Sequence, residues 1–364
     1  MSRLPHLLST GSLGALHVPN RVVMAPMTRG RARADGTVTP HTNLYFTQRA
    51  SAGLLITDAV ATAPEAVASS GTPGMWTEAQ AESWRTVVSH VHAAGGRIAL
   101  QLMHSGRLAL PAMQANDGVT LSSSPVRAKH ASTVVSEPWT EPRALEIGEI
   151  AGIVAQFAAS ARRGREVGFD AIEIHACNGC LLDQFLRDGV NRRHDRYGGS
   201  AENRARLLLQ VVEAVAKECS ADRTGVRLSP VDSANDMYDT DPLETFGTAV
   251  RHLASVQLAW THLAQMGDGD LTRRLRDIHG TPFVLNGGFT AEAADAVIRN
   301  ELASAVSFGR LYVANPDLVE RFESGAMLSD ADPATWLGDG ARGYTDYPAL
   351  SRDGATVSAG PQLK

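Results

Sequence analysis

Short apolar runs recur along the chain, and most of them are continuous instead of alternating with polar residues. Continuous runs of this length are typical of strands that are buried on both faces of a parallel sheet. Eight such runs predict eight strands, over residues 21–27, 54–60, 97–102, 171–175, 225–230, 258–265, 282–288 and 305–312.

Helical periodicity separates these runs. In residues 78–94, apolar side chains from Trp84 to Val91 recur at the spacing of one helix face. Thr290 and Asn315 stand where the N-caps of two later helices are expected. Similar patterns predict the other helices, over 147–167, 202–218, 243–256, 271–278, 291–302 and 316–323, with a weaker pattern over 41–50.

The strand and helix units follow one another without a Pro-, Gly- or Ser-rich linker. This order predicts one closed (β/α)8 TIM barrel, an α/β fold, since a doubly wound sheet does not need eight consecutive repeats of this kind. We therefore interpret residues 1–364 as a single domain. Barrels of this class commonly have about 250 residues, so about a hundred residues of this chain belong to insertions.

The longest insertion is predicted at residues 104–146, after the third strand, and it is rich in Pro, Ser and Arg. Because it follows a strand, we expect it on the C-terminal face of the barrel, where active sites form. We interpret it as a lid over the site, and a surface decoration is the alternative. Residues 350–364 form a predicted C-terminal tail.

Composition limits the classes of function. Hydrophobic residues make up 43% and charged residues 20% of the chain, and the net charge is −5, as is ordinary for soluble globular proteins. The sequence has no long basic run, so nucleic-acid binding is not expected. It also has no apolar stretch with the length of a membrane span. Without a leader-like N-terminus or a cysteine framework, a cytoplasmic protein is expected. Of three lysines only Lys129 falls in a long loop, which argues against Schiff-base chemistry.

Two glycine-bearing turns follow the seventh and eighth predicted strands. They contain Gly287 with Gly288, and Gly309 with Arg310. Barrels commonly bind phosphate in these two loops, through backbone N–H groups, and an arginine can add a bidentate contact. The sequence has no Walker A pattern and no GxGxxG after a strand. We therefore expect a phosphate site that is neither a P-loop nor a dinucleotide fold.

Arg227 closes the fifth predicted strand, and an arginine buried in a strand needs an anionic or strongly accepting partner. A salt bridge to a carboxylate of the barrel is one interpretation. The other is a positive charge beside the pyrimidine part of a flavin, whose edge Gln101 and Thr28 could meet with neutral donors and acceptors. The sequence around these residues leaves both interpretations open.

The chain resembles the Old Yellow Enzyme family of FMN-dependent ene-reductases. The resemblance runs in order from about residue 5 to 350, with matching segments at 20–29, 97–107, 173–186, 191–204, 308–318 and 343–348. It implies FMN as the cofactor, NAD(P)H as the reductant, and activated alkenes as substrates.

The resemblance also implies a role for each matching position. Thr28 would place its hydroxyl at O4 of the flavin, and Arg227 would lie at the N1 and C2 carbonyl region. The remaining implied contacts are the flavin-lining Pro26 and Met27, the pyrimidine-edge residues Ala59 and Gln101, and the phosphate-binding Gly287, Gly288, Gly309 and Arg310.

His175 ends the fourth predicted strand, and Asn178 follows on the next loop. A histidine here can be an ordinary core residue. Together with the asparagine it can instead donate two hydrogen bonds to one substrate oxygen, as in an oxyanion hole. That polarises an α,β-unsaturated carbonyl or nitro compound toward hydride transfer. The family has a His-x-x-Asn pair of this kind, which also positions the nicotinamide.

Three positions depart from the family pattern. Cys180 stands where the family usually has the proton-donating Tyr, and we expect this short thiol to be dispensable. Met103 stands where Trp is common and Leu337 where Tyr is common, which predicts a wider pocket. Cys177 and Cys180 form a CxxC pattern, but no second cysteine pair is present, so no metal is expected.

The sequence therefore predicts an NAD(P)H-dependent FMN ene-reductase, with catalytic candidates His175, Asn178 and Cys180. A reductase chiefly of nitroaromatics or nitrate esters is the nearest alternative. A non-redox phosphate-binding barrel and a catalytically silent flavoprotein are more distant ones. Monomer and homodimer are both compatible with the sequence, and the physiological substrate, the stereoselectivity and the choice between NADH and NADPH are left open.

Overall fold

The computed structural model describes residues 3–114, 118–129, 138–264, 269–281 and 283–350, and the backbone of 356–357. Eight parallel strands form a closed ring, because β13 pairs with β3 and β4 pairs with β6. The predicted closed barrel is thus confirmed. Its strands are β3 (Val22–Met24), β4 (Leu54–Ile56), β6 (Ile98–Met103), β9 (Ala171–Ala176), β10 (Thr224–Leu228), β11 (Trp260–Ala264), β12 (Phe283–Asn286) and β13 (Ala303–Phe308).

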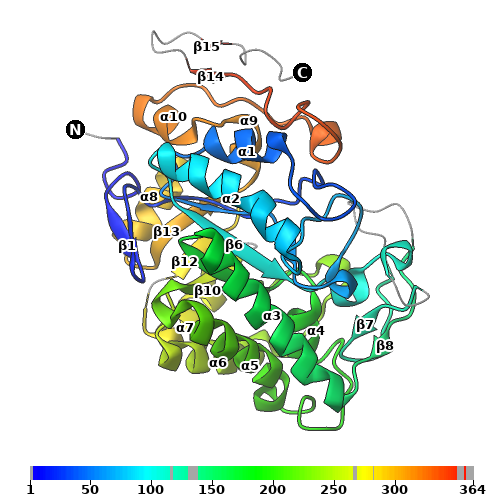
Figure 1. The fold of residues 1–364 in the computed structure, drawn as a ribbon. Helices are drawn as coiled ribbons and strands as arrows, with labels where there is room; N and C mark the ends of the chain where they lie inside the picture. The colour runs from blue at the N-terminus through cyan, green and yellow to red at the C-terminus, as the bar shows by residue number, and fades with distance from the viewer. Residues whose placement is uncertain are drawn as a thin grey trace.

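Helices surround the strands (Figure 1). The residues that face inward are the apolar ones, such as Trp84, Val88 and Val91 of α2, all nearly inaccessible to solvent. Thr77 and Gln80 form a capping box at the start of that helix, which satisfies two otherwise unpaired N–H groups. The helices are α1 (Pro40–Thr47), α2 (Glu78–Ala93), α3 (Ile147–Val167), α4 (Leu181–Leu186), α5 (Ala201–Cys219), α6 (Pro242–Val256), α7 (Gly269–His279), α8 (Ala291–Arg299), α9 (Arg310–Ala314) and α10 (Leu318–Ser324).

A hairpin that the sequence pattern missed closes the N-terminal end of the barrel. Its strands β1 (Gly11–Leu13) and β2 (Leu16–Val18) are antiparallel, and their apolar side chains pack with those of the barrel strands. Gly14 turns the hairpin with φ +55°, and a Cβ there would lie 2.2 Å from the carbonyl oxygen of Asp222. Only glycine fits both the left-handed backbone and this close approach.

Two details at the eighth unit differ from the prediction. The strand predicted over 305–312 ends at Phe308, and α9 begins at Arg310. Asn315 is not an N-cap, because α10 begins only after Asp317. Its side chain instead donates to the carbonyl of Leu311 and accepts from the backbone N–H of Ser329. The predicted cap at Thr290 is confirmed, since its hydroxyl accepts from the N–H of Ala293.

Short elements decorate the barrel. In the segment predicted as a lid, the parallel pair β7 (Leu121–Ser122) and β8 (Arg143–Ala144) precedes α3, while 115–117 and 130–137 lie outside the described residues. The other short elements are β5 (Val60–Ala61), β14 (Ala349–Leu350), β15 (Thr356–Val357), and the 3-10 turns Pro64–Ala66, Gly106–Leu108, Pro111–Met113, Ala221–Arg223, Ala234–Asp236 and Pro333–Thr335.

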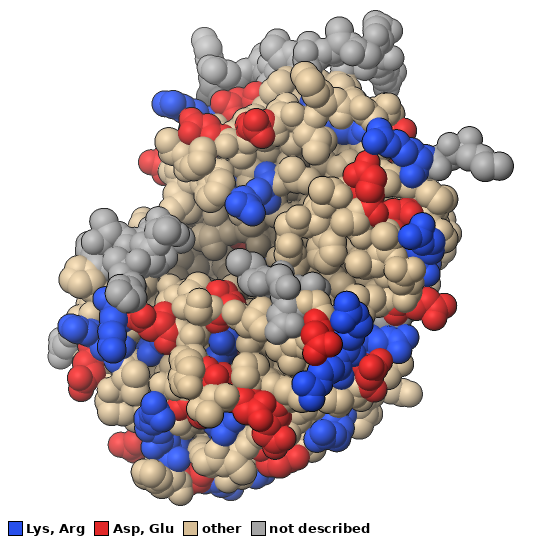
Figure 2. All heavy atoms as spheres, turned by 180° about the vertical axis from the view of Figure 1, so that it is seen from behind, with Lys and Arg blue, Asp and Glu red and all other residues tan. Residues whose placement is uncertain are grey.

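The surface carries both signs of charge side by side. On the face that Figure 2 shows, basic and acidic side chains are interspersed, and the hollow near its centre is formed mostly by uncharged residues. Among the described residues, no helix combines the length and the apolar character needed to cross a bilayer.

Candidate functional site

A cavity lies at the C-terminal ends of the barrel strands, and residues from five of the eight strand-and-loop units meet there. Nine of the residues singled out in the sequence line it: Pro26, Thr28, Ala59, Gln101, Met103, His175, Asn178, Cys180 and Arg227. They are far apart in the chain and share only their position at or just beyond a strand end. The barrel topology therefore brings the predicted residues together.

A second cavity extends from the glycine turns that follow β12 and β13. It is lined by Met27, Gly287, Gly288, Gly309 and Arg310, among others. Gly288 has φ +76°, a left-handed backbone that favours glycine. A Cβ at Gly309 would lie 2.7 Å from the sulfur of Met27, so this backbone packs closely against the segment after β3. The two turns predicted to bind phosphate thus border one space.

Arg227 lines the first cavity and contacts Asn286, which lines the second. Its Nη2 donates to Oδ1 of Asn286 over 3.1 Å, and its Nε is buried without a partner among the residues that the structure describes. Among the described residues, its guanidinium forms no ion pair, and the carboxylate of Glu173 is paired with His262 instead. The described residues thus do not support the salt-bridge interpretation of Arg227, whose Nε is left as a buried donor in a residue that lines the first cavity.

The buried carboxylate of Glu173 fixes the orientation of Gln101, which lines the first cavity. Glu173 accepts hydrogen bonds from Nε2 of Gln101 at 2.7 Å, Nε1 of Trp260 at 2.8 Å and Nδ1 of His262 at 2.9 Å. Burial lowers the pKa of His262, so its neutral ring donates through Nδ1 and accepts at Nε2 from the Ser307 hydroxyl. The side-chain oxygen of Gln101, Oε1, is buried and has no partner in the described part of the chain.

His175 is adjacent to Arg227 in the pairing of β9 with β10, and its side chain is 7% exposed. Burial, reinforced by the charge of Arg227, lowers the pKa of His175 to about 3. The ring is neutral near pH 7 and carries one N–H. It can therefore donate one hydrogen bond into the cavity without adding a charge to it.

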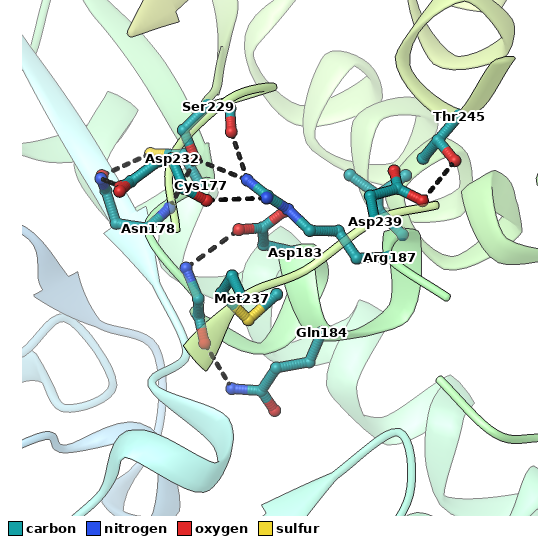
Figure 3. A network of polar contacts seen from close by, with 12 residues as sticks. Cys177, Asn178, Asp183, Gln184, Arg187, Ser229, Asp232, Met237, Asp239 and Thr245 are labelled. Atoms are coloured by element: carbon teal, nitrogen blue, oxygen red, sulfur yellow. Dashed lines mark hydrogen bonds and ion pairs between the residues drawn. The ribbon is translucent and has the colours of Figure 1, made fainter. Parts of the chain in front are cut away.

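Asn178 occupies a tight turn with φ +54°, a conformation that asparagine tolerates better than most residues. Both ends of its side-chain amide have partners (Figure 3). Nδ2 donates to a carboxylate oxygen of Asp232, and Oδ1 accepts from the Cys177 thiol at 3.0 Å. The backbone N–H donates to the Ser229 hydroxyl at 2.8 Å. One of the two N–H donors of this amide is thus already in use.

Cys180 lines the cavity, but its thiol is a poor acid. Burial raises its pKa to about 12, and burial also raises the pKa of Cys177. The buried environment therefore counts against Cys180 as a proton donor. Among the described residues, no cluster of His, Cys, Asp and Glu is arranged to hold a metal ion.

The two positions that were predicted to widen the pocket, Met103 and Leu337, lie in different places. Met103 lines the cavity, whereas Leu337 does not lie among the lining residues; it sits 3.6 Å from where a Cβ of Gly30 would be. The sequence reasoning missed several lining residues, of which Trp139 is the largest. A bulky aromatic residue inside the predicted lid was the available signal for Trp139. Asp232, which contacts Asn178 but does not line the cavity, had only the weaker signal of an acidic residue on the loop that follows β10.

The buried acceptor of Gln101 and the buried donor of Arg227 fit the edge of an isoalloxazine ring, which has both donors and acceptors. The adjoining cavity offers glycine turns and Arg310 to a phosphate. This combination of fold and site defines a flavin-binding TIM barrel.

Comparison with known proteins identifies the family. The profile of the NADH:flavin oxidoreductase / NADH oxidase family matches residues 12–329. The chain is 37% identical to 12-oxophytodienoate reductase 1 of Oryza sativa subsp. japonica, over 94% of this chain and 93% of that protein. Its structure resembles morphinone reductase in complex with tetrahydroNAD, with a TM-score of 0.92, 40% identity, and coverage of 96% and 99%. An old yellow enzyme homologue from Zymomonas mobilis gives a TM-score of 0.91, 37% identity, and coverage of 95% and 100%.

The chain belongs to the NADH:flavin oxidoreductase / NADH oxidase family, which includes the Old Yellow Enzymes. It is an NAD(P)H-dependent flavin oxidoreductase, and its cofactor is FMN. The predicted family, fold and cofactor are thereby confirmed.

Proposed function

We propose that this enzyme reduces activated alkenes, with His175 and Asn178 holding the substrate oxygen. The observation that carries the proposal is that both residues line the same cavity as Gln101 and Arg227, each of which has a buried polar atom without a partner among the described residues. FMN reduced by NAD(P)H would supply hydride at this site, and the β-carbon of the alkene would accept it. An α,β-unsaturated carbonyl or nitro group provides the oxygen.

The two donors act on the charge that develops on this oxygen. His175 is neutral and gives one N–H, and the second N–H of the Asn178 amide gives another. Donors fixed in advance stabilise developing negative charge without reorganising, and each is worth roughly a few kcal/mol in comparable sites. A neutral histidine suits this task, because it donates a hydrogen bond without placing a full positive charge in a buried site.

The residues proposed to hold FMN fall into two groups. Gln101, Arg227, Thr28, Ala59 and Pro26 border the first cavity and would contact the ring. Met27 borders the second cavity and would also line the flavin. Gly287, Gly288, Gly309 and Arg310 border the second cavity and would hold the phosphate.

The proton that completes the reduction comes, in this proposal, from solvent and not from Cys180. The thiol is buried, has a pKa of about 12 and is a weak hydrogen-bond donor. Cys180→Ala should therefore keep enone reduction within about threefold of the original rate. Complete loss of enone reduction, with FMN still bound and still reduced by nicotinamide, would assign the proton to Cys180.

The test of the proposed function is a pair of anaerobic half-reactions. The purified yellow protein should bleach with NADH or NADPH and recolour with 2-cyclohexenone. His175→Ala and Asn178→Ala should each slow recolouring by about 100-fold while FMN stays bound. Equal rates in the original and variant proteins would refute the assignment of these two residues.

The nearest alternative is a reductase chiefly of nitroaromatics or nitrate esters, whose oxygens would engage the same two donors. A panel that sets 2-cyclohexenone and 1-nitrocyclohexene against nitrobenzene and a nitrate ester separates the two. Higher kcat/KM for the alkenes supports ene-reduction, and higher values for the other two compounds support the alternative.

A further inference from the structure

Asp232 lies on the loop between β10 and α6 and is the only described acidic side chain that accepts a hydrogen bond from Asn178. Its Oδ2 takes the bond from Nδ2 of Asn178, and its Oδ1 accepts from the backbone N–H of Ala234 at 2.8 Å. Neither cavity has Asp232 in its lining. It therefore reaches the site only through Asn178.

The opposite end of the same amide is also held. Cys177, which is fully buried, donates its thiol proton to Oδ1 of Asn178 at 3.0 Å. A carboxylate can only accept and a thiol here donates, so the two partners together fix which end of the amide is nitrogen. A flipped amide would turn its carbonyl oxygen toward Asp232 and lose both hydrogen bonds.

The Asp232 loop is itself tied to the loop of Asn178. Arg187 forms a buried ion pair with Asp183 at 2.9 Å and donates to the carbonyl oxygen of Asp232 at 2.8 Å. From the other side, Asn235 donates to the carbonyl oxygen of Asn178 at 2.9 Å. Figure 3 shows Arg187 between Asp183 and the residues Ser229 and Asp232. Asp232 is thus held in place independently of any substrate.

We infer that Asp232 is a positioning residue, which orients the Asn178 amide so that its free N–H is available to a carbonyl oxygen in the cavity. The inference rests on the proposed function, in which Asn178 binds that oxygen. Without Asp232 the amide rotates about its last side-chain bond, and for part of the time it presents an oxygen that repels the ligand. Removing Asp232 therefore weakens the binding of the ligand and leaves the binding of FMN unchanged.

The test uses the FMN-loaded enzyme and tetrahydroNAD, an unreactive nicotinamide analogue, with the dissociation constant read from the change in flavin absorbance. Asp232→Ala should weaken binding by about tenfold, the equivalent of one hydrogen bond. Asp232→Asn, whose carbonyl can still accept from Asn178, should stay within about threefold of the original. Ser233→Ala, at the exposed neighbouring position, is the matched control and should change nothing.

A double-mutant cycle separates positioning from a general effect on the loop. In the Asn178→Ala background, adding Asp232→Ala should cause no further loss, because the amide to be oriented is gone. A loss that persists in that background, or unaltered binding in Asp232→Ala alone, overturns the inference. If Asn178→Ala itself leaves binding unchanged, the proposed function fails, and this inference fails with it. Melting temperatures and FMN content of each variant confirm that the proteins are folded.

Discussion

Nε2 of Gln101 donates to Oε2 of Glu173 over 2.7 Å, and this bond determines what Gln101 can offer to a ligand. A carboxylate only accepts, so the amide nitrogen must face Glu173 and the amide oxygen must face away from it. That oxygen is buried without a partner in the part of the chain that the structure describes. The floor of the cavity therefore presents one acceptor, from Gln101, beside one donor, from Arg227.

Replacing Gln101 tests the acceptor. Gln101→Leu should weaken FMN binding to the apoprotein by about tenfold, because a ring N–H loses its partner inside a buried site. Riboflavin has the same ring without the phosphate, so its affinity should fall by the same factor. Titrations of apoprotein monitored by flavin fluorescence give both constants. Unchanged affinity for both flavins would remove Gln101 from the site.

Replacing Arg310 tests the predicted phosphate site, and it should affect the binding of FMN and of riboflavin differently. Arg310→Gln should weaken FMN binding by about tenfold, since a charge-assisted contact to phosphate is lost, but should leave riboflavin binding unaltered. Arg299→Gln, at an exposed position on α8, serves as the control and should alter neither constant. Equal losses for FMN and riboflavin would indicate that Arg310 supports the fold and does not bind phosphate.

The sequence predicted the barrel because its strands are buried on both faces and therefore appear as continuous apolar runs. The same logic located Gln101, His175 and Arg227, since the barrel topology brings the ends of parallel strands to one face. The sequence predicts the ends of strands less accurately, as at Phe308, because an apolar run can continue from a strand into the following helix.

The contacts that the sequence did not predict depend on loops. Whether Asp232 reaches Asn178 is decided by the path of the chain after β10, which includes Asn235 and Asp236 with positive φ angles. Trp139 reaches the cavity from an insertion without helical or strand periodicity. Neither path leaves a repeating pattern in the sequence, so only the folded structure shows these neighbours.

The neutral state of His175 predicts that ligand binding depends little on pH. Its pKa is about 3, so the ring stays neutral from pH 5 to pH 8. The dissociation constant of tetrahydroNAD should therefore vary by less than about twofold over this range, whereas an unperturbed histidine would titrate near 6.5. A clear inflection between pH 6 and pH 7 that disappears in His175→Ala would contradict this prediction.

His104 predicts a dependence of stability on pH. Its side chain is 1% exposed, and burial lowers its pKa to about 3. The unfolded chain takes up the proton near pH 6.5 and the folded chain does not. Stability is therefore lost as the pH falls from about 6.5 toward 3, at up to about 1.4 kcal/mol per pH unit.

In His104→Asn this contribution is removed, while the new side chain can still accept from the Gly106 N–H as Nδ1 of His104 does at 3.1 Å. Urea unfolding of the two apoproteins between pH 7 and pH 5 should show a difference in stability that shrinks as the pH falls, equivalent to the uptake of about one proton. A constant difference over this range would show that His104 takes up a proton in the folded protein as readily as in the unfolded chain.

Trp139 predicts a change in substrate range. It is 4% exposed, packs with Leu108, Leu110 and Ala128, and contributes an aromatic wall to the cavity. Trp139→Leu keeps this cluster apolar but removes a ring from the cavity. The KM for 2-cyclohexenone should rise by about threefold to tenfold, since a small ligand loses apolar contact, and kcat/KM for the bulkier 4-phenyl-3-buten-2-one should rise relative to it. Met113→Ala, at a position that is 37% exposed and outside the cavity lining, is the control. An unchanged ratio of kcat/KM between the two enones would show that Trp139 stabilises its segment without limiting the size of the substrate.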